Sequence, residues 1–153
     1  MSVEISNESD VDVDVAEIRR LAEFSLDALH VSPDADLGVT FTDPATMTTL
    51  HEKWLDLPGP TDVLSFPMDE LRPGTEDAPT PAGLLGDIVV CPQVAERQAV
   101  EAGHSTLAEI RLLVVHGLLH LLGFDHAEPD EKAEMFGIQD QLLAGFRHYG
   151  RRE

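Results

Sequence analysis

Residues 106–126 read TLAEIRLLVVHGLLHLLGFDH and form one of the most apolar stretches of an otherwise acidic chain. The pattern predicts a helix that is apolar on nearly every face, and such a helix belongs in the centre of a domain. Thr106 followed by Glu109 predicts a capping box at its start. Gly123 predicts its end, because glycine readily adopts the left-handed conformation that follows many helices. We therefore expect the rest of the chain to pack around this helix.

Three histidines of this stretch have the spacing of metal ligands. His116 and His120 are four residues apart, so on a helix they share one face and lie roughly 6 Å apart along its axis. After the helix ends, the chain can turn back and bring His126 to the same point. Neutral imidazole suits zinc, and three protein nitrogens leave a fourth tetrahedral position open for water, the nucleophile of many zinc enzymes. We therefore predict a catalytic metal centre with one zinc ion per chain.

The residue after the first histidine decides between two kinds of zinc enzyme. The spacing H-x3-H-x2-G-x2-H also occurs in metzincin proteases, which carry a glutamate at that position. Here the position is Gly117, so the general base of the protease is missing. Glycine inside a helix costs about 1 kcal/mol relative to alanine. Its presence indicates that substrate, or another part of the chain, approaches closely there, and a zinc metalloprotease remains the alternative enzyme.

The remaining periodicities predict an α+β fold of about four strands and five helices. Strands are expected at residues 2–7, 34–43, 61–67 and 84–91, and helices at residues 15–30, from residue 44, at 92–103, at 106–122 and from about residue 130. In the helix from residue 44, Met47, Leu50 and Trp54 recur at helical spacing and are expected to face inward. Residues 68–83, rich in proline, glycine and acids, predict an exposed loop. No repeat or boundary divides residues 1–153, so we expect a single domain.

Composition narrows the function classes. The chain has 153 residues, with 10 basic and 29 acidic side chains and a net charge of −19. This charge opposes direct electrostatic capture of nucleic acid. A single cysteine, Cys91, excludes a disulfide framework, and the first residues, MSVEISNESD, lack the features of a signal peptide. No apolar run reaches the roughly 18 to 20 residues of a membrane helix. We therefore expect a cytoplasmic protein that contacts no membrane.

Three motifs together resemble the YbeY family of bacterial rRNA maturation factors, which are zinc-dependent, single-strand-specific endoribonucleases. They are HGLLHLLGFDH at residues 116–126, PTDVLSFP at residues 60–67 and LLGDIVVC at residues 84–91. Their order and separation match the family, and the resemblance covers most of the chain. It implies that His116, His120 and His126 bind zinc. It also implies a small mixed sheet packed with helices, and a zinc helix like that of the metzincins.

The resemblance also implies a biological role. Family members trim the 3′ end of small-subunit ribosomal RNA and act in ribosome quality control. The implied partners are ribosomal RNA, the small ribosomal subunit, a small-subunit ribosomal protein and the GTPase Era. Because this chain is so acidic, we expect it to dock on basic ribosomal proteins and to reach RNA through them.

One position departs from the family pattern. Members often carry an arginine, implicated in RNA handling, six residues before the threonine of TDVLSFP, and here that position is Leu55. Leucine cannot hydrogen-bond a phosphate. Either another basic residue takes the place of the arginine, or the activity differs. Arg72, Arg97 and Arg111 are the candidates, and the sequence does not rank them.

Further residues are candidates for supporting roles. Arg111 is a candidate to stabilise charge developing on the phosphate. Asp125 is expected either to orient His126 or its bound water, or to be an exposed turn residue. Asp87 is expected to hydrogen-bond a ligand histidine, or else to cap its strand.

Three residues of the TDVLSFP strand, and the one cysteine, leave further alternatives open. Asp62 and Ser65 are expected to border the cleft, and Phe66 is expected either to stack on a base or to lie in the core. A non-catalytic ribosome-assembly factor with a structural zinc would need a fourth ligand, and Cys91 is the only thiol available. At the end of a strand, Cys91 more readily fits the role of a small buried residue.

Overall fold

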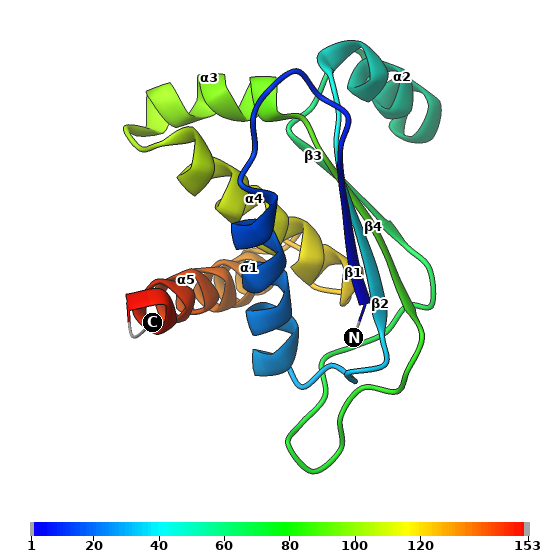
Figure 1. Cartoon of the computed structure of the whole chain (residues 1–153). Coiled ribbons are helices and arrows are strands. Elements are labelled where there is room, and N and C mark those ends of the chain that lie inside the picture. The colour runs from blue at the N-terminus through cyan, green and yellow to red at the C-terminus, as the bar shows by residue number, and fades with distance from the viewer. Residues whose placement is uncertain (1, 152–153) are drawn as a thin grey trace.

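A computed structural model describes the backbone of residues 2–151 and the side chains of residues 2–147. Within these residues the chain forms four strands and five helices, as predicted (Figure 1). In chain order they are β1 (Ser2–Asn7), α1 (Val15–Ala28), β2 (Asp36–Phe41), α2 (Pro44–Leu55), β3 (Val63–Pro67), β4 (Leu84–Val90), α3 (Pro92–Ala102), α4 (Thr106–Leu121) and α5 (Pro129–Arg151). The chain therefore has the α+β fold that the sequence predicts.

The four strands form one mixed sheet in the order β1-β2-β4-β3. Strands β1, β2 and β4 are parallel, whereas β3 pairs antiparallel with β4 and places Ser65 opposite Ile88. Because β3 is last in the order, it is an edge strand with one side unpaired. The mixed sheet agrees with the expectation.

The helices cover the two faces of the sheet unequally. Figure 1 shows α1, α3, α4 and α5 on one side of the sheet and α2 at one end of the other side. Leu37, Val39 and Phe41 are buried on the face that receives α1 and α4. On the opposite face, Met47 of α2 packs in a smaller cluster with Leu64. The rest of that second face has no helix over it among the described residues.

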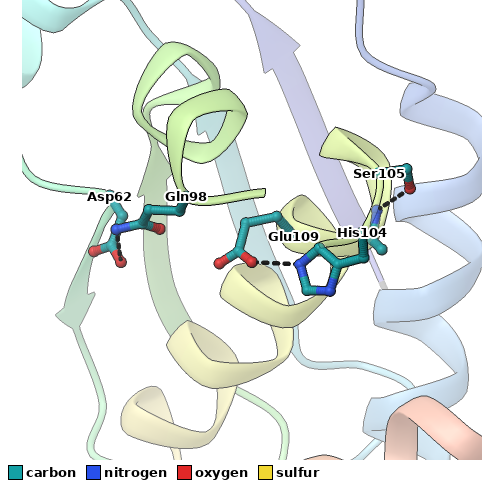
Figure 2. Close-up of polar contacts among 6 residues, drawn as sticks. Asp62, Gln98, His104, Ser105 and Glu109 are labelled. Atoms are coloured by element: carbon teal, nitrogen blue, oxygen red, sulfur yellow. Dashed lines mark hydrogen bonds and ion pairs between the residues drawn. The ribbon is translucent and has the colours of Figure 1, made fainter. Parts of the chain in front are cut away.

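Helix α4 is the central helix, as its composition predicts, but it begins differently. Ser105 is its N-cap and its Oγ accepts a hydrogen bond from the Ala108 N–H at 3.0 Å. The predicted capping box of Thr106 and Glu109 is therefore wrong by one residue. Glu109 instead meets His104, with its Oε1 2.6 Å from the ring Nε2 (Figure 2). Gly123 has a φ of +93° and follows the helix end as predicted.

Over residues 2–151, no helix combines the length and the apolar composition needed to cross a bilayer, and this includes the apolar α4.

The sequence prediction for α2 is wrong at its last turn. Met47 is fully buried, but Trp54 is 58% exposed although both were expected to face inward. Helical spacing indicates which face of a helix is apolar and not how far the neighbouring element extends. Trp54 reaches the β3 edge, where its ring contacts Phe66. Little beyond that edge covers the indole.

Gly117 explains how α4 approaches the sheet. A Cβ atom built on Gly117 would lie 2.9 Å from Ile88 Cγ2, 3.1 Å from Ser65 Oγ and 3.3 Å from Val63 Cγ2. The Ser65 hydroxyl also donates a hydrogen bond to the Gly117 carbonyl at 2.9 Å. The close approach that the glycine indicates is therefore made by the chain's own strands β3 and β4. This contact lowers α4 onto the sheet directly beside His116.

We predict that Gly117→Ala lowers the free energy of unfolding by about 1–3 kcal/mol, the usual cost of overpacking a core. The clash outweighs the gain of about 1 kcal/mol that alanine brings to a helix. Gly137→Ala in α5 is the matched control, because no atom lies within 4 Å of its added Cβ, and it should be neutral or stabilising. Denaturant unfolding of both variants measures this. Equal stability of the two would contradict the packing argument.

Candidate metal centre

The side chains of His116, His120 and His126 converge on one point. One ring nitrogen from each lies within 4.8 Å of the other two, and the Nε2 atoms of His116 and His120 are 3.1 Å apart. Two imidazole nitrogens on a tetrahedral zinc ion, each at 2.0–2.1 Å from it, are about 3.3 Å apart. The donor set and its spacing therefore fit a single zinc ion. In the described part of the chain, no carboxylate or thiol joins this group.

Gln139 of α5 orients the first ligand. Its Oε1 lies 3.0 Å from Nδ1 of His116, and only 7% of the residue is exposed. Because an amide oxygen accepts hydrogen bonds, His116 donates its Nδ1–H to it and keeps the lone pair of Nε2 for a metal. The contact selects the tautomer and the ring orientation that a metal site needs. Gln139 gave no signal in the sequence, because it lies 23 residues away on the next helix.

Phe136 packs against His126, and burial affects the pKa of His120. The Phe136 ring stacks on His126, with centroids 6.2 Å apart and planes 24° apart. Burial lowers the pKa of His120 below 6.5, and positive charge on His116 or His126 would lower it further, while Asp125 acts in the opposite direction. A lowered pKa favours the neutral imidazole, which is the form that binds metals.

The three histidines line an open cleft of about 610 Å³. Its other walls come from the end of α2 and from β3 with the residue before it: Trp54, Leu55, Asp62, Val63, Leu64, Ser65, Phe66 and Pro67. No lysine or arginine is among the described residues that line it. The cleft therefore combines one wall of three histidines that could hold a metal ion with mostly apolar surroundings.

Several residues predicted from the TDVLSFP motif lie at this cleft in structural roles. The Asp62 carboxylate accepts hydrogen bonds from the Val63 N–H at 2.7 Å and from Gln98 Nε2 at 3.2 Å (Figure 2). Ser65 is bonded to α4, and Phe66 contacts Trp54. Asp62 thus holds the start of β3 against α3, and its oxygens already have partners.

Asp125 lies beside the metal centre. Its Oδ1 accepts a hydrogen bond from the backbone N–H of His126 at 2.7 Å. This bond holds the turn that carries the third histidine, so Asp125 acts on the backbone of His126 and not on its ring.

The structure does not bring Asp87 and Arg111 to the histidines. Asp87 is exposed on the sheet face opposite α4, with its carboxylate over Gly38, because side chains alternate along β4 and Ile88 takes the position facing α4. Arg111 lies 3.3 Å from Glu17 of α1, away from the cleft. The roles proposed for these two side chains therefore require a correction: Asp87 cannot orient a ligand ring, and Arg111 is engaged in an ion pair.

The other arginines that could replace the family arginine also lie outside the cleft. The Arg72 side chain lies against Gly123, which is in the turn that follows α4. Arg97 is an exposed residue of α3. Leu55, where the family often has arginine, does line the cleft and is 53% exposed. Cys91 is fully buried with Met47 in the cluster beneath α2, so it does not close the metal site.

An α+β fold with three histidines that could hold one metal ion at an open cleft fits the class of metal-dependent hydrolases. Comparison with known proteins is more specific. The family model of endoribonuclease YbeY matches residues 4–147. The chain therefore belongs to the endoribonuclease YbeY family, whose members are hydrolytic enzymes.

Individual relatives agree over nearly the whole chain. The protein named endoribonuclease YbeY from Clavibacter sepedonicus is 69% identical over 146 residues, 95% of each chain. The one from Leifsonia xyli subsp. xyli is 60% identical over 151 residues, 99% of each chain. The solution structure of a Thermotoga maritima protein matches with a TM-score of 0.65 at 26% identity, over 98% of this chain and 92% of that one.

We predict that Gln139→Leu lowers the affinity for Zn²⁺ by about 10- to 100-fold while one ion per chain still binds, because the loss of an orienting partner typically has this effect. Gln98→Leu is the matched control, since it removes a glutamine that bonds Asp62 and no ligand. Competition with a coloured chelator measures both affinities. Unchanged affinity in Gln139→Leu would contradict the orienting role.

Proposed function

We propose that this chain is a zinc-dependent, single-strand-specific endoribonuclease that acts in the maturation of the 3′ end of small-subunit ribosomal RNA and in ribosome quality control. One observation carries the proposal: three histidine nitrogens converge at an open cleft. Membership of the endoribonuclease family supports RNA as the substrate. The resemblance of the sequence motifs supports the ribosomal role and a cytoplasmic location.

The residues of the chain divide the work at this cleft. His116, His120 and His126 would hold the zinc ion, which when bound supplies Lewis-acid catalysis and activation of water. Gln139 holds the Nδ1 proton of His116, and Asp125 holds the turn that carries His126. Residues 63–67 of the edge strand β3 form another wall of the same cleft.

Gly117 also bears on the protease alternative. Peptide hydrolysis by zincins uses a glutamate beside the first histidine as general base. At that position this chain has a glycine packed against two strands, and a glutamate side chain would not fit there. The only carboxylate among the described cleft residues, Asp62, is bonded to Val63 and Gln98. The geometry therefore disfavours peptide hydrolysis by the zincin route.

Electrostatics supports a requirement for a partner. The net charge is −19, and no lysine or arginine occurs among the described residues of the cleft. The acidic chain would therefore repel free RNA at long range, and the cleft would offer few cationic contacts to offset this repulsion. Basic ribosomal proteins on the small subunit would attract the same acidic surface. The small subunit, and the GTPase Era through the family resemblance, are the partners that we propose.

The direct test compares cleavage of RNA from the 3′ end of small-subunit ribosomal RNA, free and within the small-subunit particle. Zinc-loaded protein should cleave the particle faster at physiological salt, and His120→Ala should lose at least about 100-fold on both substrates. His30→Asn, which replaces an exposed histidine at a φ of +57°, should leave the rates unchanged. Undiminished cleavage by His120→Ala would contradict the metal mechanism. Equal cleavage of both substrates by the unmodified enzyme would contradict the need for a partner.

Leu55 provides a second test. Leu55→Arg places one cation at the lip of the cleft, and we predict an increase on the order of tenfold in the cleavage of free single-stranded RNA, from one charged hydrogen bond to phosphate. The slope of log affinity against log salt should steepen by about 0.7. Leu57→Arg adds the same charge on a residue outside the cleft lining and should change cleavage little. Equal effects of the two substitutions would indicate a general charge effect instead.

A further inference from the structure

Trp54 is exposed at the lip of the histidine cleft. It is the only tryptophan of the chain, it is 58% exposed, and it lines the same cleft as the three histidines. Single exposed apolar residues are ordinary features of protein surfaces. Here, however, Trp54 and its neighbour Leu55 both line the cleft and are each more than half exposed. An apolar lip at a metal-binding cleft suggests contact with an uncharged part of the substrate.

The indole ring is held in a defined position. Its centroid lies 6.1 Å from that of Phe66 on β3, with the ring planes 71° apart, an edge-to-face contact. The Nζ atom of Lys53 lies 5.2 Å from the indole centroid. The two contacts keep the ring beside the edge strand, and more than half of the residue stays accessible to a ligand.

The charge of the cleft restricts how it can hold RNA. Nucleic-acid sites usually draw their affinity from lysine and arginine contacts to phosphate. The described lining of this cleft contains no lysine and no arginine. The Lys53 ammonium group lies over the Trp54 ring at the lip of the cleft. Stacking of nucleobases on aromatic rings, which does not depend on the identity of the base, is therefore the main contact that the side chains beside the histidines can offer to RNA. A base within a duplex is already stacked and paired, so such contact also selects single strands.

We propose that Trp54 is a stacking platform for a nucleobase of the single-stranded RNA, adjacent to the linkage that lies over the histidines. The proposal rests on the proposed function and specifies how the same site holds its substrate. Stacking of one base on one aromatic side chain changes affinity by roughly 5- to 150-fold when the ring is removed. Trp54 is thus a binding residue, and the metal ligands are separate from it.

Because the chain has one tryptophan, its intrinsic fluorescence reports on this residue alone. The full-length protein, kept metal-free so that no cleavage occurs, is titrated at low salt with a single-stranded hexaribonucleotide. A backbone of the same length without bases serves as the matched ligand. We expect saturable quenching by the hexaribonucleotide and little by the abasic backbone. The proposal would be overturned by equal quenching with both ligands or by no quenching. It would also be overturned by quenching that depends on protein concentration, because this would indicate that a second copy of the chain covers Trp54.

Variants provide an independent measurement by fluorescence anisotropy of a labelled hexaribonucleotide. Trp54→Ala should weaken binding by about tenfold, and Trp54→Phe should keep most of the affinity because a ring remains. Val100→Ala, at an 82% exposed apolar residue of α3, is the control and should bind as the unmodified protein does. Unchanged binding by Trp54→Ala would overturn the proposal.

The binding data and the cleavage data separate the two proposals. Quenching and the Trp54→Ala defect without metal-dependent cleavage would contradict the proposed function and support the stacking platform. Normal cleavage without quenching would support the proposed function and overturn the stacking platform.

Discussion

The contact between Gly117 and strands β3 and β4 is the constraint on which the rest of the structure depends. A helix normally keeps its neighbours at the distance that its side chains set, and here one residue without a side chain lets α4 settle onto the sheet. The Ser65 hydroxyl bonds the helix at the same point. His116 and His120 are thereby held at the wall opposite the edge strand β3. The helix end at Gly123 then returns the chain so that His126 completes the group.

Much of this arrangement could be predicted from sequence, because it depends on local spacing. The strands, the helices and the three converging histidines all follow from periodicities of two and 3.6 residues and from the glycine that ends α4. Gln139 and Phe136 could not be predicted, since they reach the histidines through the packing of a separate helix. The predictions for Asp87 and Trp54 were wrong for a related reason. The sequence pattern does not determine which face of the sheet packs against α4, or how far along α2 the neighbouring strand extends.

The net charge of the chain and the charge of the cleft lining differ in character. The acidic charge is spread over the chain, whereas the cleft is lined by imidazoles, apolar side chains and one bonded carboxylate. Such a site has little long-range attraction for RNA and a short-range surface suited to stacking. The two proposals, delivery by a basic partner and stacking of a nucleobase on Trp54, would together offset this weak attraction. Leu55, at the position where the family often has arginine, fits the same account.

The measurement that tests the central claim most directly is X-ray absorption at the zinc edge of the loaded protein. An open centre held by His116, His120 and His126 predicts three nitrogen neighbours at about 2.0–2.1 Å and one oxygen from solvent. A sulfur neighbour at about 2.3 Å, or a fourth imidazole, would show a closed structural site. That result would contradict the account, because a closed site leaves no position at which substrate or water can bind.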